Sequence, residues 1–125
     1  MQDLNISLIQ ADLHWEEIDA NLAMFEELIW SIDDTDLIVL PEMFTTGFSM
    51  NAEKLAEPPG GKTFKWMRQM ASQLNVAVTG SYIVRDKGQY FNRLYFVYPD
   101  GSSKQYDKKH TFNLAKEGDT YTAAF

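Results

Sequence analysis

Glu42 is the residue whose type and position point most directly to chemistry. It follows an apolar run at once, in the sequence Leu40-Pro41-Glu42-Met43-Phe44. A carboxylate at the carboxyl end of a buried strand lies at the edge where the sites of open α/β sheets gather. Its apolar neighbours favour desolvation, which suits a general base. The alternative is an acidic strand end that faces solvent, and the local pattern does not decide between the two.

A second candidate group is the lysine pair in the sequence Tyr106-Asp107-Lys108-Lys109-His110-Thr111-Phe112. Because side chains alternate along a strand, at most one of Lys108 and Lys109 faces the interior. An interior lysine needs a carboxylate partner, for which Glu42 is a candidate, and a fixed ammonium can stabilise a developing oxyanion. The competing interpretation, which the residues alone favour, is two solvated lysines on an edge strand.

The other polar motifs carry less information. Glu117 is, by local pattern alone, an ordinary loop acid. His14 and His110 are isolated, and their spacing fits no metal-ligand motif. The sequence Gly60-Gly61-Lys62-Thr63 is similar to the end of a phosphate-binding loop, but Ala56 stands where that loop needs its first glycine. We therefore expect neither a metal site nor a nucleotide cofactor.

An α/β fold must position these groups. Alternating and helical apolar periods predict strands over residues 4–10, 37–40, 76–84, 90–98 and 103–108, and helices over residues 16–32 and 63–74. The order is β-α-β-α-β-β-β, in which the first half alternates as parallel units do and the second half is a hairpin meander. Glu16, Glu17 and Asp19 are expected in the first turn of the first helix. Residues 43–61 are predicted to be irregular, and the run 37–40 to be buried on both faces.

Composition limits the classes of function. The 125 residues include 18 acidic and 11 basic side chains, a formal net charge of −7, so we expect no basic stripe for nucleic acid or an anionic membrane. No apolar run approaches the roughly 20 residues that cross a bilayer, and the first residues lack the features of a signal peptide. The length is typical of one domain with its own core. The chain has no cysteine, which excludes disulfides, thiolate metal sites and a cysteine nucleophile within it.

Four segments carry a family resemblance. They are Ile9-Gln10-Ala11-Asp12, the stretch from Leu40 to Met50, Phe91-Asn92-Arg93, and the stretch from Tyr106 to Phe112. Together and in this order they resemble the amino-terminal part of the nitrilase (carbon–nitrogen hydrolase) superfamily, and most of all its omega-amidase-like branch. The resemblance covers essentially the whole chain, and residues 41–50 are its most specific part. It implies the amino-terminal half of a four-layer α-β-β-α sandwich, with residues 1–125 as a single incomplete domain.

The resemblance also implies an activity and roles for single residues. Members of the family cleave linear amides, and the omega-amidase-like branch cleaves side-chain amides of 2-oxo acids, with a cysteine nucleophile, a glutamate base, a lysine and a second glutamate. By the motif match, Glu42 is the general base, Lys108 binds the tetrahedral intermediate and Glu117 is the second glutamate. Phe44 and Phe48, beside Glu42, are expected near the substrate pocket. No cofactor or metal is implied.

The missing cysteine is the main departure from the family. In the family it lies a few tens of residues further on, and this chain ends first. Because the base then has no thiol to deprotonate, we expect an inactive amino-terminal half of an amidase. Strands without their partner layer leave open edges and apolar faces, so we expect self-association or a poorly soluble monomer. An intact member is expected to be cytoplasmic and homo-oligomeric.

Two functions of other classes stay open. A phosphoacceptor receiver domain has this length and acidity, but Glu42 is a poor substitute for its central aspartate, and three successive strands break its alternation. A non-catalytic α/β binding module, in which Glu42 and Lys108 form only a structural ion pair, is compatible with the residues. Replacing Glu42 by glutamine in an intact enzyme tests this second alternative. Activity should collapse with stability nearly intact if Glu42 is the base, and the reverse is expected if its role is structural.

Overall fold

The structure is a computed structural model that describes residues 3–108 and 120–122. Its elements, in chain order, are β1 (Ile6–Leu8), α1 (Ile18–Trp30), β2 (Leu37–Val39), α2 (Ala52–Leu55), α3 (Lys62–Leu74), β3 (Ala77–Asp86), β4 (Gln89–Val97) and β5 (Ser103–Asp107). The predicted order is confirmed, except that α2 lies inside the stretch predicted to be irregular. A helix of four residues is too short to produce an apolar period in the sequence.

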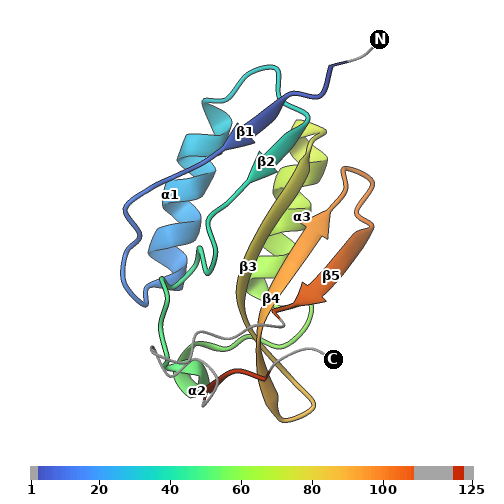
Figure 1. The fold of residues 1–125 in the computed structure, drawn as a ribbon. Coiled ribbons are helices and arrows are strands. Elements are labelled where there is room, and N and C mark those ends of the chain that lie inside the picture. The colour runs from blue at the N-terminus through green and yellow to red at the C-terminus, as the bar shows by residue number, and fades with distance from the viewer. Residues whose placement is uncertain (1–2, 109–119, 123–125) are drawn as a thin grey trace.

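The five strands form one mixed sheet in the order β1-β2-β3-β4-β5. β1, β2 and β3 are parallel, and β3, β4 and β5 are antiparallel (Figure 1). Lys87 and Gly88 join β3 to β4 with φ values of 52° and 78°, and a tight two-residue hairpin needs such positive φ values. The antiparallel meander contradicts the receiver-domain alternative, which needs a helix between successive parallel strands.

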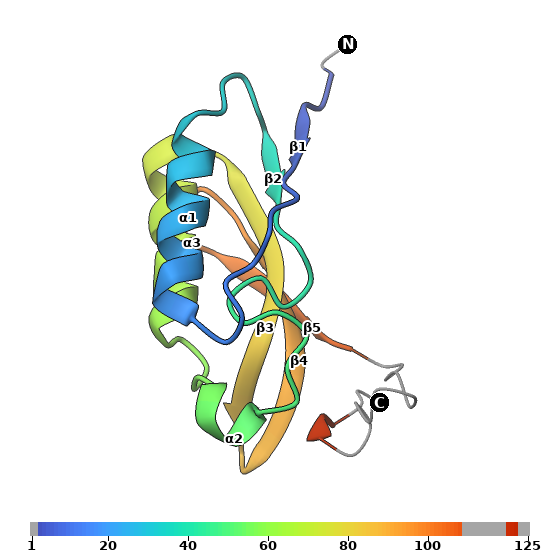
Figure 2. The ribbon, with the colours of Figure 1, turned by 90° about the vertical axis from the view of Figure 1, so that its left-hand side faces the viewer.

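Both long helices lie on one face of the sheet (Figure 2). The predicted apolar stripe of α1 is confirmed, with Leu22, Phe25 and Ile29 buried. The inward face of α3 is also confirmed, with Met67 and Ala71 buried. The sheet residues on the other side of this core are Ile38, Val78, Tyr82, Val84, Tyr95 and Val97. The helix layer and the inner face of the sheet thus form the main core.

The start of α1 differs from the prediction. Glu16 has a φ of 57° and Glu17 is the N-cap, so only Asp19 of the three predicted acids lies in the first turn. The N–H of Glu16 donates to the Thr46 carbonyl at 2.8 Å, and its carboxylate accepts a hydrogen bond from Ser49 Oγ at 2.6 Å. These contacts with the loop after β2 override the local preference for helix.

Neither of the long helices, α1 and α3, covers the second face of the sheet (Figure 2). Alternation along the strands places Ile6, Leu8, Leu94 and Tyr106 on this face, where all four are exposed. The prediction that β2 is buried on both faces is wrong, because its residues on this side are only partly covered. One helix layer on a sheet with an apolar second face agrees with the amino-terminal half of the four-layer sandwich that the resemblance implies.

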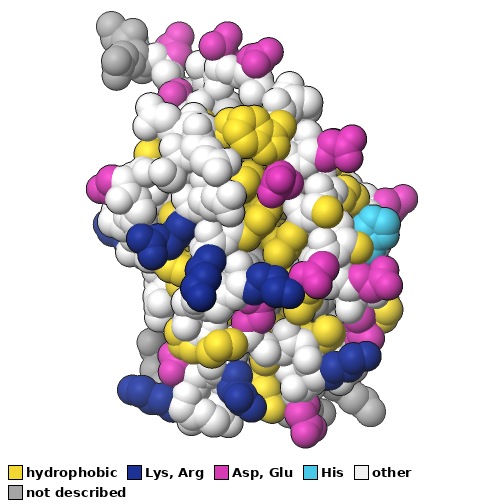
Figure 3. All heavy atoms as spheres, turned by 180° about the vertical axis from the view of Figure 1, so that it is seen from behind, with side chains coloured by type: hydrophobic (Ala, Val, Ile, Leu, Met, Phe, Trp, Pro, Cys, Tyr) yellow, Lys and Arg dark blue, Asp and Glu magenta, His cyan; other side chains and the backbone are white. Residues whose placement is uncertain are grey.

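The outer surface of the helix layer is largely polar. Figure 3 shows acidic and basic side chains spread over this face, with hydrophobic side chains between them. The predicted outward residues of α3, Lys62, Lys65 and Arg68, are exposed. The two long helices are therefore amphipathic, apolar toward the sheet and charged outward. In the part of the chain that the structure describes, no helix is long and apolar enough to span a membrane.

Candidate active site

Glu42 is held at the carboxyl end of β2 by bonds to β3. The N–H of Met43 donates to Ser81 Oγ at 2.9 Å, and the N–H of Phe44 donates to the Ser81 carbonyl at 3.1 Å. Pro41 has no N–H to continue the ladder, and Met43 turns the chain with a φ of 51°. The Glu42 carboxylate is thereby presented at the carboxyl edge of the parallel strands, as the sequence predicts.

Gly80 of β3 gives the loop after Glu42 room to approach the sheet. A Cβ at this position would lie 2.9 Å from Phe44 Cδ1 and 3.0 Å from the Cβ of Leu40. Real Cβ atoms do not make contacts this short, so a larger residue would push the loop outward. The close seating of Leu40 and Phe44 therefore depends on this glycine.

Asn21 of α1 ties the same loop to the helix layer. Its Nδ2 donates to the carbonyls of His14 and Thr45, both at 2.7 Å, and its Oδ1 accepts from the N–H of His14 at 2.7 Å. The side chain is fully buried, and each of its polar atoms has a partner. The segment that follows Glu42 is thus anchored both to the sheet and to α1.

Lys108 reaches the carboxylate of Glu42 across β3 and β4, on the same face of the sheet. It directly follows β5, and its N–H donates to the Asn92 carbonyl at 3.0 Å. Its Nζ lies 3.1 Å from Glu42 Oε2, so the structure brings the predicted pair together. The side chains are 30% and 51% exposed, so solvent screens the pair and it adds little to stability.

Asn92 of β4 is a site residue to which the sequence motifs assign no role. Its Nδ2 donates to Glu42 Oε2 at 2.7 Å, the same oxygen that Lys108 approaches. Asn92 is 3% exposed, and among the residues that the structure describes its Oδ1 has no hydrogen-bond partner. One feature of the sequence could have indicated this role. Asn92 is a polar amide within a strand rich in aromatic residues, and a buried amide needs hydrogen-bond partners. Among the described residues nothing bonds to the other oxygen of Glu42, Oε1.

These side chains line an open pocket of about 310 Å³ on the second face of the sheet. Its walls are Leu40, Glu42, Ser81, Asn92, Leu94, Tyr106 and Lys108. Because the pocket opens to solvent, the expectation that apolar neighbours desolvate Glu42 is wrong for the chain as described. Apolar walls with a few convergent polar groups are typical of sites for small molecules.

The two predicted pocket phenylalanines lie in different places. The ring centroid of Phe48 is 5.2 Å from Lys108 Nζ, a cation–π contact at the site. Phe44 is fully buried and packs edge-on against Phe25 and Tyr82 in the core. It is not part of the pocket wall, so its placement gives no support to a substrate contact.

Glu117, the predicted second glutamate, lies outside the described residues, as do Lys109 and His110. Of the predicted site residues, the structure therefore brings together Glu42, Lys108 and Phe48. Within the described ranges, no group of three or more Asp, Glu or His side chains could hold a metal ion.

The start of α3, where residues 60–63 are similar to a phosphate-binding loop, is capped by a carboxylate of the chain itself. The carboxylate of Glu57 accepts hydrogen bonds from the N–H and the hydroxyl of Thr63, the first of them 2.8 Å long. A carboxylate in this place satisfies the helix N-terminus as a bound phosphate would. The structure thus agrees with the rejection of a nucleotide site here.

The arrangement around Glu42 has the parts of an acid–base centre. One carboxylate oxygen is held by an amide and an ammonium, which leaves the other oxygen to take a proton. The ammonium of Lys108 can offset negative charge on an oxyanion in the pocket. The chain contains no cysteine that could act as the nucleophile. The described residues therefore bring a carboxylate, an amide and an ammonium together beside one pocket.

Comparison with known proteins identifies the family of the chain. Residues 5–124 match the carbon-nitrogen hydrolase family. The chain is 40% identical over 123 residues to the omega-amidase YafV of Yersinia enterocolitica, and 32% identical over 116 residues to the 2-oxoglutaramate amidase of Bacillus subtilis. These matches cover 98% and 90% of this chain, but only 48% and 45% of the two relatives.

A solved structure shares the fold closely. XC1258 from Xanthomonas campestris, described as a CN-hydrolase superfamily protein with an arsenic adduct in the active site, has a TM-score of 0.95 and 39% identity to this chain. The comparison covers 100% of this chain and 48% of that one, so the chain spans about half the length of the relatives it matches. The family match over nearly every residue, together with this fold, shows that the chain belongs to the carbon–nitrogen hydrolase (nitrilase) family, in its omega-amidase-like branch.

Proposed function

We propose that this chain supplies the amino-terminal half of an amidase that hydrolyses linear amides through a cysteine thioester, with the cysteine provided by sequence beyond residue 125. The observation that supports the proposal is the convergence of Asn92 and Lys108 on one oxygen of Glu42 beside a pocket. This arrangement equips Glu42 as the base and Lys108 as the cation for the tetrahedral intermediate. Glu117 is proposed as the second glutamate, as the family motif implies.

The proposed substrates are the omega-amides of 2-oxo acids. Two relatives carry the names omega-amidase and 2-oxoglutaramate amidase, which supports this class. The pocket also suits a short acyl chain, because Leu40 and Leu94 add apolar wall to its polar groups. The family resemblance further leads us to propose that the whole enzyme is homo-oligomeric and cytoplasmic.

In the proposed reaction Glu42 Oε1 takes the proton of the thiol, and the sulfur attacks the amide carbon. The carbonyl oxygen gains the displaced electron pair, and Lys108 offsets its charge. The carbon–nitrogen bond then breaks, and the proton on Glu42 passes to the nitrogen, so that ammonia leaves. Glu42 next takes a proton from water, whose oxygen attacks the thioester carbon. The carbon–sulfur bond breaks, the carboxylic acid leaves, and the proton on Glu42 returns to the sulfur.

Without the thiol, the first of these steps has no reactant. Loss of a nucleophile removes nearly all of the acceleration that such a set of groups provides together, on the order of 10⁶. We therefore propose that this chain alone does not turn over amides. Measurable hydrolysis of glutamine-like or 2-oxo-acid amides by the 125 residues would contradict the need for a cysteine.

Complementation provides the test. The chain is co-expressed with the carboxyl-terminal half of the Yersinia enterocolitica omega-amidase, the part of that relative that this chain does not match, and ammonia release from 2-oxoglutaramate is measured. We expect activity from the two halves together, from neither half alone, and from no pair in which Glu42 is replaced by glutamine. A pair that co-purifies but releases no ammonia would support the binding-module alternative instead.

A further inference from the structure

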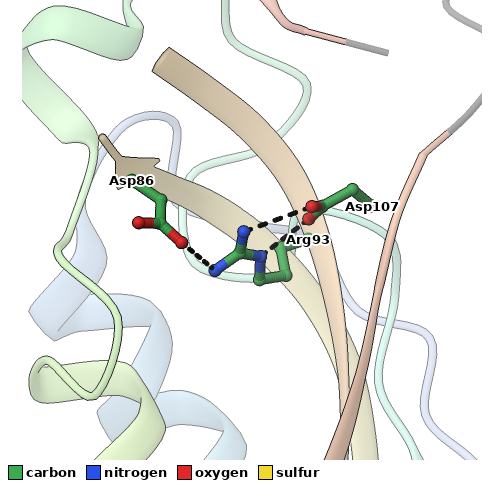
Figure 4. A network of polar contacts seen from close by, with 3 residues as sticks. All are labelled: Asp86, Arg93 and Asp107. Atoms are coloured by element: carbon green, nitrogen blue, oxygen red, sulfur yellow. Dashed lines mark hydrogen bonds and ion pairs between the residues drawn. The ribbon is translucent and has the colours of Figure 1, made fainter. Parts of the chain in front are cut away.

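Arg93 of β4 lies at the centre of a charged network (Figure 4). Because side chains alternate along β4, this network lies on the other face of the sheet from Asn92 and the pocket. Its Nε and Nη2 reach the two carboxylate oxygens of Asp107 at 2.7 and 3.2 Å, and its Nη1 reaches Asp86 at 3.1 Å. The guanidinium side chain is only 4% exposed. The hydrogen bond to Asp107 is the main cause that raises the pKa of Arg93 above its usual range. A two-pronged bond of this kind fixes both the distance and the orientation of its partners.

The network joins Arg93 to Asp107, and each of these residues is the sequence neighbour of a residue that lines the pocket. Arg93 and Asp107 are direct partners in the register of β4 and β5, while Asn92 precedes Arg93 and Lys108 follows Asp107. The ladder continues through them, because the N–H of Lys108 donates to the Asn92 carbonyl. Side chains of neighbouring residues point to opposite faces of a sheet. The charged pair on one face therefore determines where Asn92 and Lys108 stand on the other.

β5 takes part of its register from the turn that joins it to β4, where the N–H of Tyr98 donates to the Ser102 carbonyl at 2.8 Å, and most of its own side chains add little. It is an edge strand of five residues, and Ser103, Lys104, Gln105 and Tyr106 are all exposed. Register is set firmly where one face of a strand is buried, and weakly in exposed polar strands. A shift by one residue would turn Lys108 away from Glu42, since every side chain would change faces. In β5, Asp107 is the residue whose side chain makes a buried, directional contact.

We propose that the Arg93–Asp107 pair is a positioning device for the site: by fixing the register of β5, it sets Lys108 against Glu42. Only the catalytic role of the Lys108–Glu42 contact rests on the proposed function. The register of β5 and the contact itself do not depend on any reaction. A buried ion pair often adds little to stability relative to apolar residues, so a role in specifying one arrangement is the better-supported reason for its presence.

Carbodiimide coupling measures this geometry in the chain as it stands. The reagent joins a carboxylate to an amine in direct contact, and the Glu42–Lys108 amide is then quantified by peptide mass spectrometry. The Asp19–Lys62 pair, 2.7 Å apart and joining α1 to α3, provides an internal standard in the same molecule. The ratio of the two products separates a local shift of β5 from a general loss of folding.

Asp107→Asn is expected to lower that ratio by about tenfold or more, because it weakens two charge-assisted bonds at once. Asp86→Asn is the matched control: it removes a bond to the same guanidinium but leaves β5 in register, and it should keep the wild-type ratio. If Asp107→Asn does not fold, Arg93→Lys gives the same comparison, since it keeps the charge and loses the two-pronged bond.

An unchanged ratio in the Asp107 and Arg93 variants would overturn the inference, and so would an equal fall in Asp86→Asn. Because coupling needs no turnover, these outcomes are distinct from a failure of the proposed amidase activity. In the complemented pair of half-chains, Asp107→Asn should lower kcat with little change in KM, while Asp107→Glu should restore part of kcat.

Discussion

The side-chain amide of Asn92 donates a 2.7 Å hydrogen bond to the carboxylate of Glu42, across 50 positions of sequence. It reaches Oε2, the oxygen that the Lys108 ammonium also approaches at 3.1 Å. Two donors on one oxygen restrain rotation of the carboxylate. In the proposed reaction Oε1 then remains for proton transfer, so Asn92 orients the base without contacting the proton.

Replacing Asn92 by alanine is expected to slow the complemented enzyme by about 10–100-fold, the factor that one hydrogen bond to a charged group provides. The effect should appear in kcat more than in KM, because the amide holds the base and not the substrate. Steady-state ammonia release measures both constants. Asn51→Ala, at an exposed asparagine that makes no side-chain cap for α2, should retain wild-type kinetics. An unaltered kcat in Asn92→Ala would leave the hydrogen bond with a structural role only.

Glu42→Gln keeps the size of the side chain but removes the base. We expect kcat of the complemented enzyme to fall by about 10²–10⁴-fold. The free energy of unfolding should change by less than about 1 kcal/mol, because the ion pair with Lys108 is half exposed. Urea unfolding of the isolated chain measures the second quantity, and Glu53→Gln, at an exposed acid, is the control. The opposite pattern, lost stability with intact turnover, would assign Glu42 a structural role.

Tyr82 should make stability depend on pH in the alkaline range. Its hydroxyl is buried and has no hydrogen-bond partner within residues 3–108 and 120–122, and burial raises its pKa above the usual value of 10.0. Above pH 10 the unfolded chain loses this proton while the folded chain keeps it, so the free energy of unfolding falls as the pH rises. Tyr82→Phe should weaken that fall and raise stability by about 1 kcal/mol at neutral pH.

Urea titrations at a series of pH values provide the measurement. Tyr106→Phe, at an exposed tyrosine, is the control and should keep the wild-type slope. If Tyr82→Phe lowers the free energy of unfolding at neutral pH, the Tyr82 hydroxyl makes a stabilising hydrogen bond and the prediction is wrong.

Gly80→Ala should destabilise the chain by about 1–3 kcal/mol, because the new methyl group would press on Phe44 and Leu40. The same pressure would move the loop that carries Glu42, so activity of the complemented enzyme should fall as well. Gly60→Ala is the comparison: its φ is 74° but nothing lies within 4 Å of the added carbon, so it should cost only about 1 kcal/mol of backbone strain. Equal effects at the two positions would argue against the packing explanation.

The isolated chain is expected to self-associate through the second face of its sheet, where apolar side chains are exposed and edges are open. Leu8→Lys with Leu94→Lys should shift the chain toward monomer in sedimentation velocity runs over a range of concentrations. Leu28→Lys is the matched control, since Leu28 and Leu94 are both 39% exposed but Leu28 lies on α1. A monomer at all concentrations, in the wild-type chain, would contradict this expectation.

Most of the fold was predictable because its elements bury regular stripes. The period of Leu22, Phe25 and Ile29 predicts α1, and the turn signals at residues 86–89 and 99–102 predict the meander. The failures come from contacts between residues that are distant in sequence. Glu16 is drawn out of the helix by Thr46 and Ser49, which lie about 30 residues away, and such contacts leave no trace in a local period.

The candidate site was predictable only in part, for a related reason. The chemistry of an interior lysine predicts a carboxylate partner, and the structure brings Lys108 to Glu42. The apolar periods that predict strands and helices do not predict that Asn92 contacts Oε2 of Glu42. That contact depends on the register of two antiparallel strands. The placement of Phe44 in the core likewise depends on a left-handed turn at Met43, a conformation that is uncommon for this residue type.

The strand order has a consequence for how the molecule matures. Glu42 follows β2 and Lys108 follows β5, with β3 and β4 between them, so their contact spans the sheet and 66 positions of sequence. Closing so long a segment costs entropy before any contact offsets it, and distant strand pairs form slowly. We therefore expect Glu42 and Lys108 to meet only after β2, β3, β4 and β5 have paired, so that assembly of the sheet precedes assembly of the site.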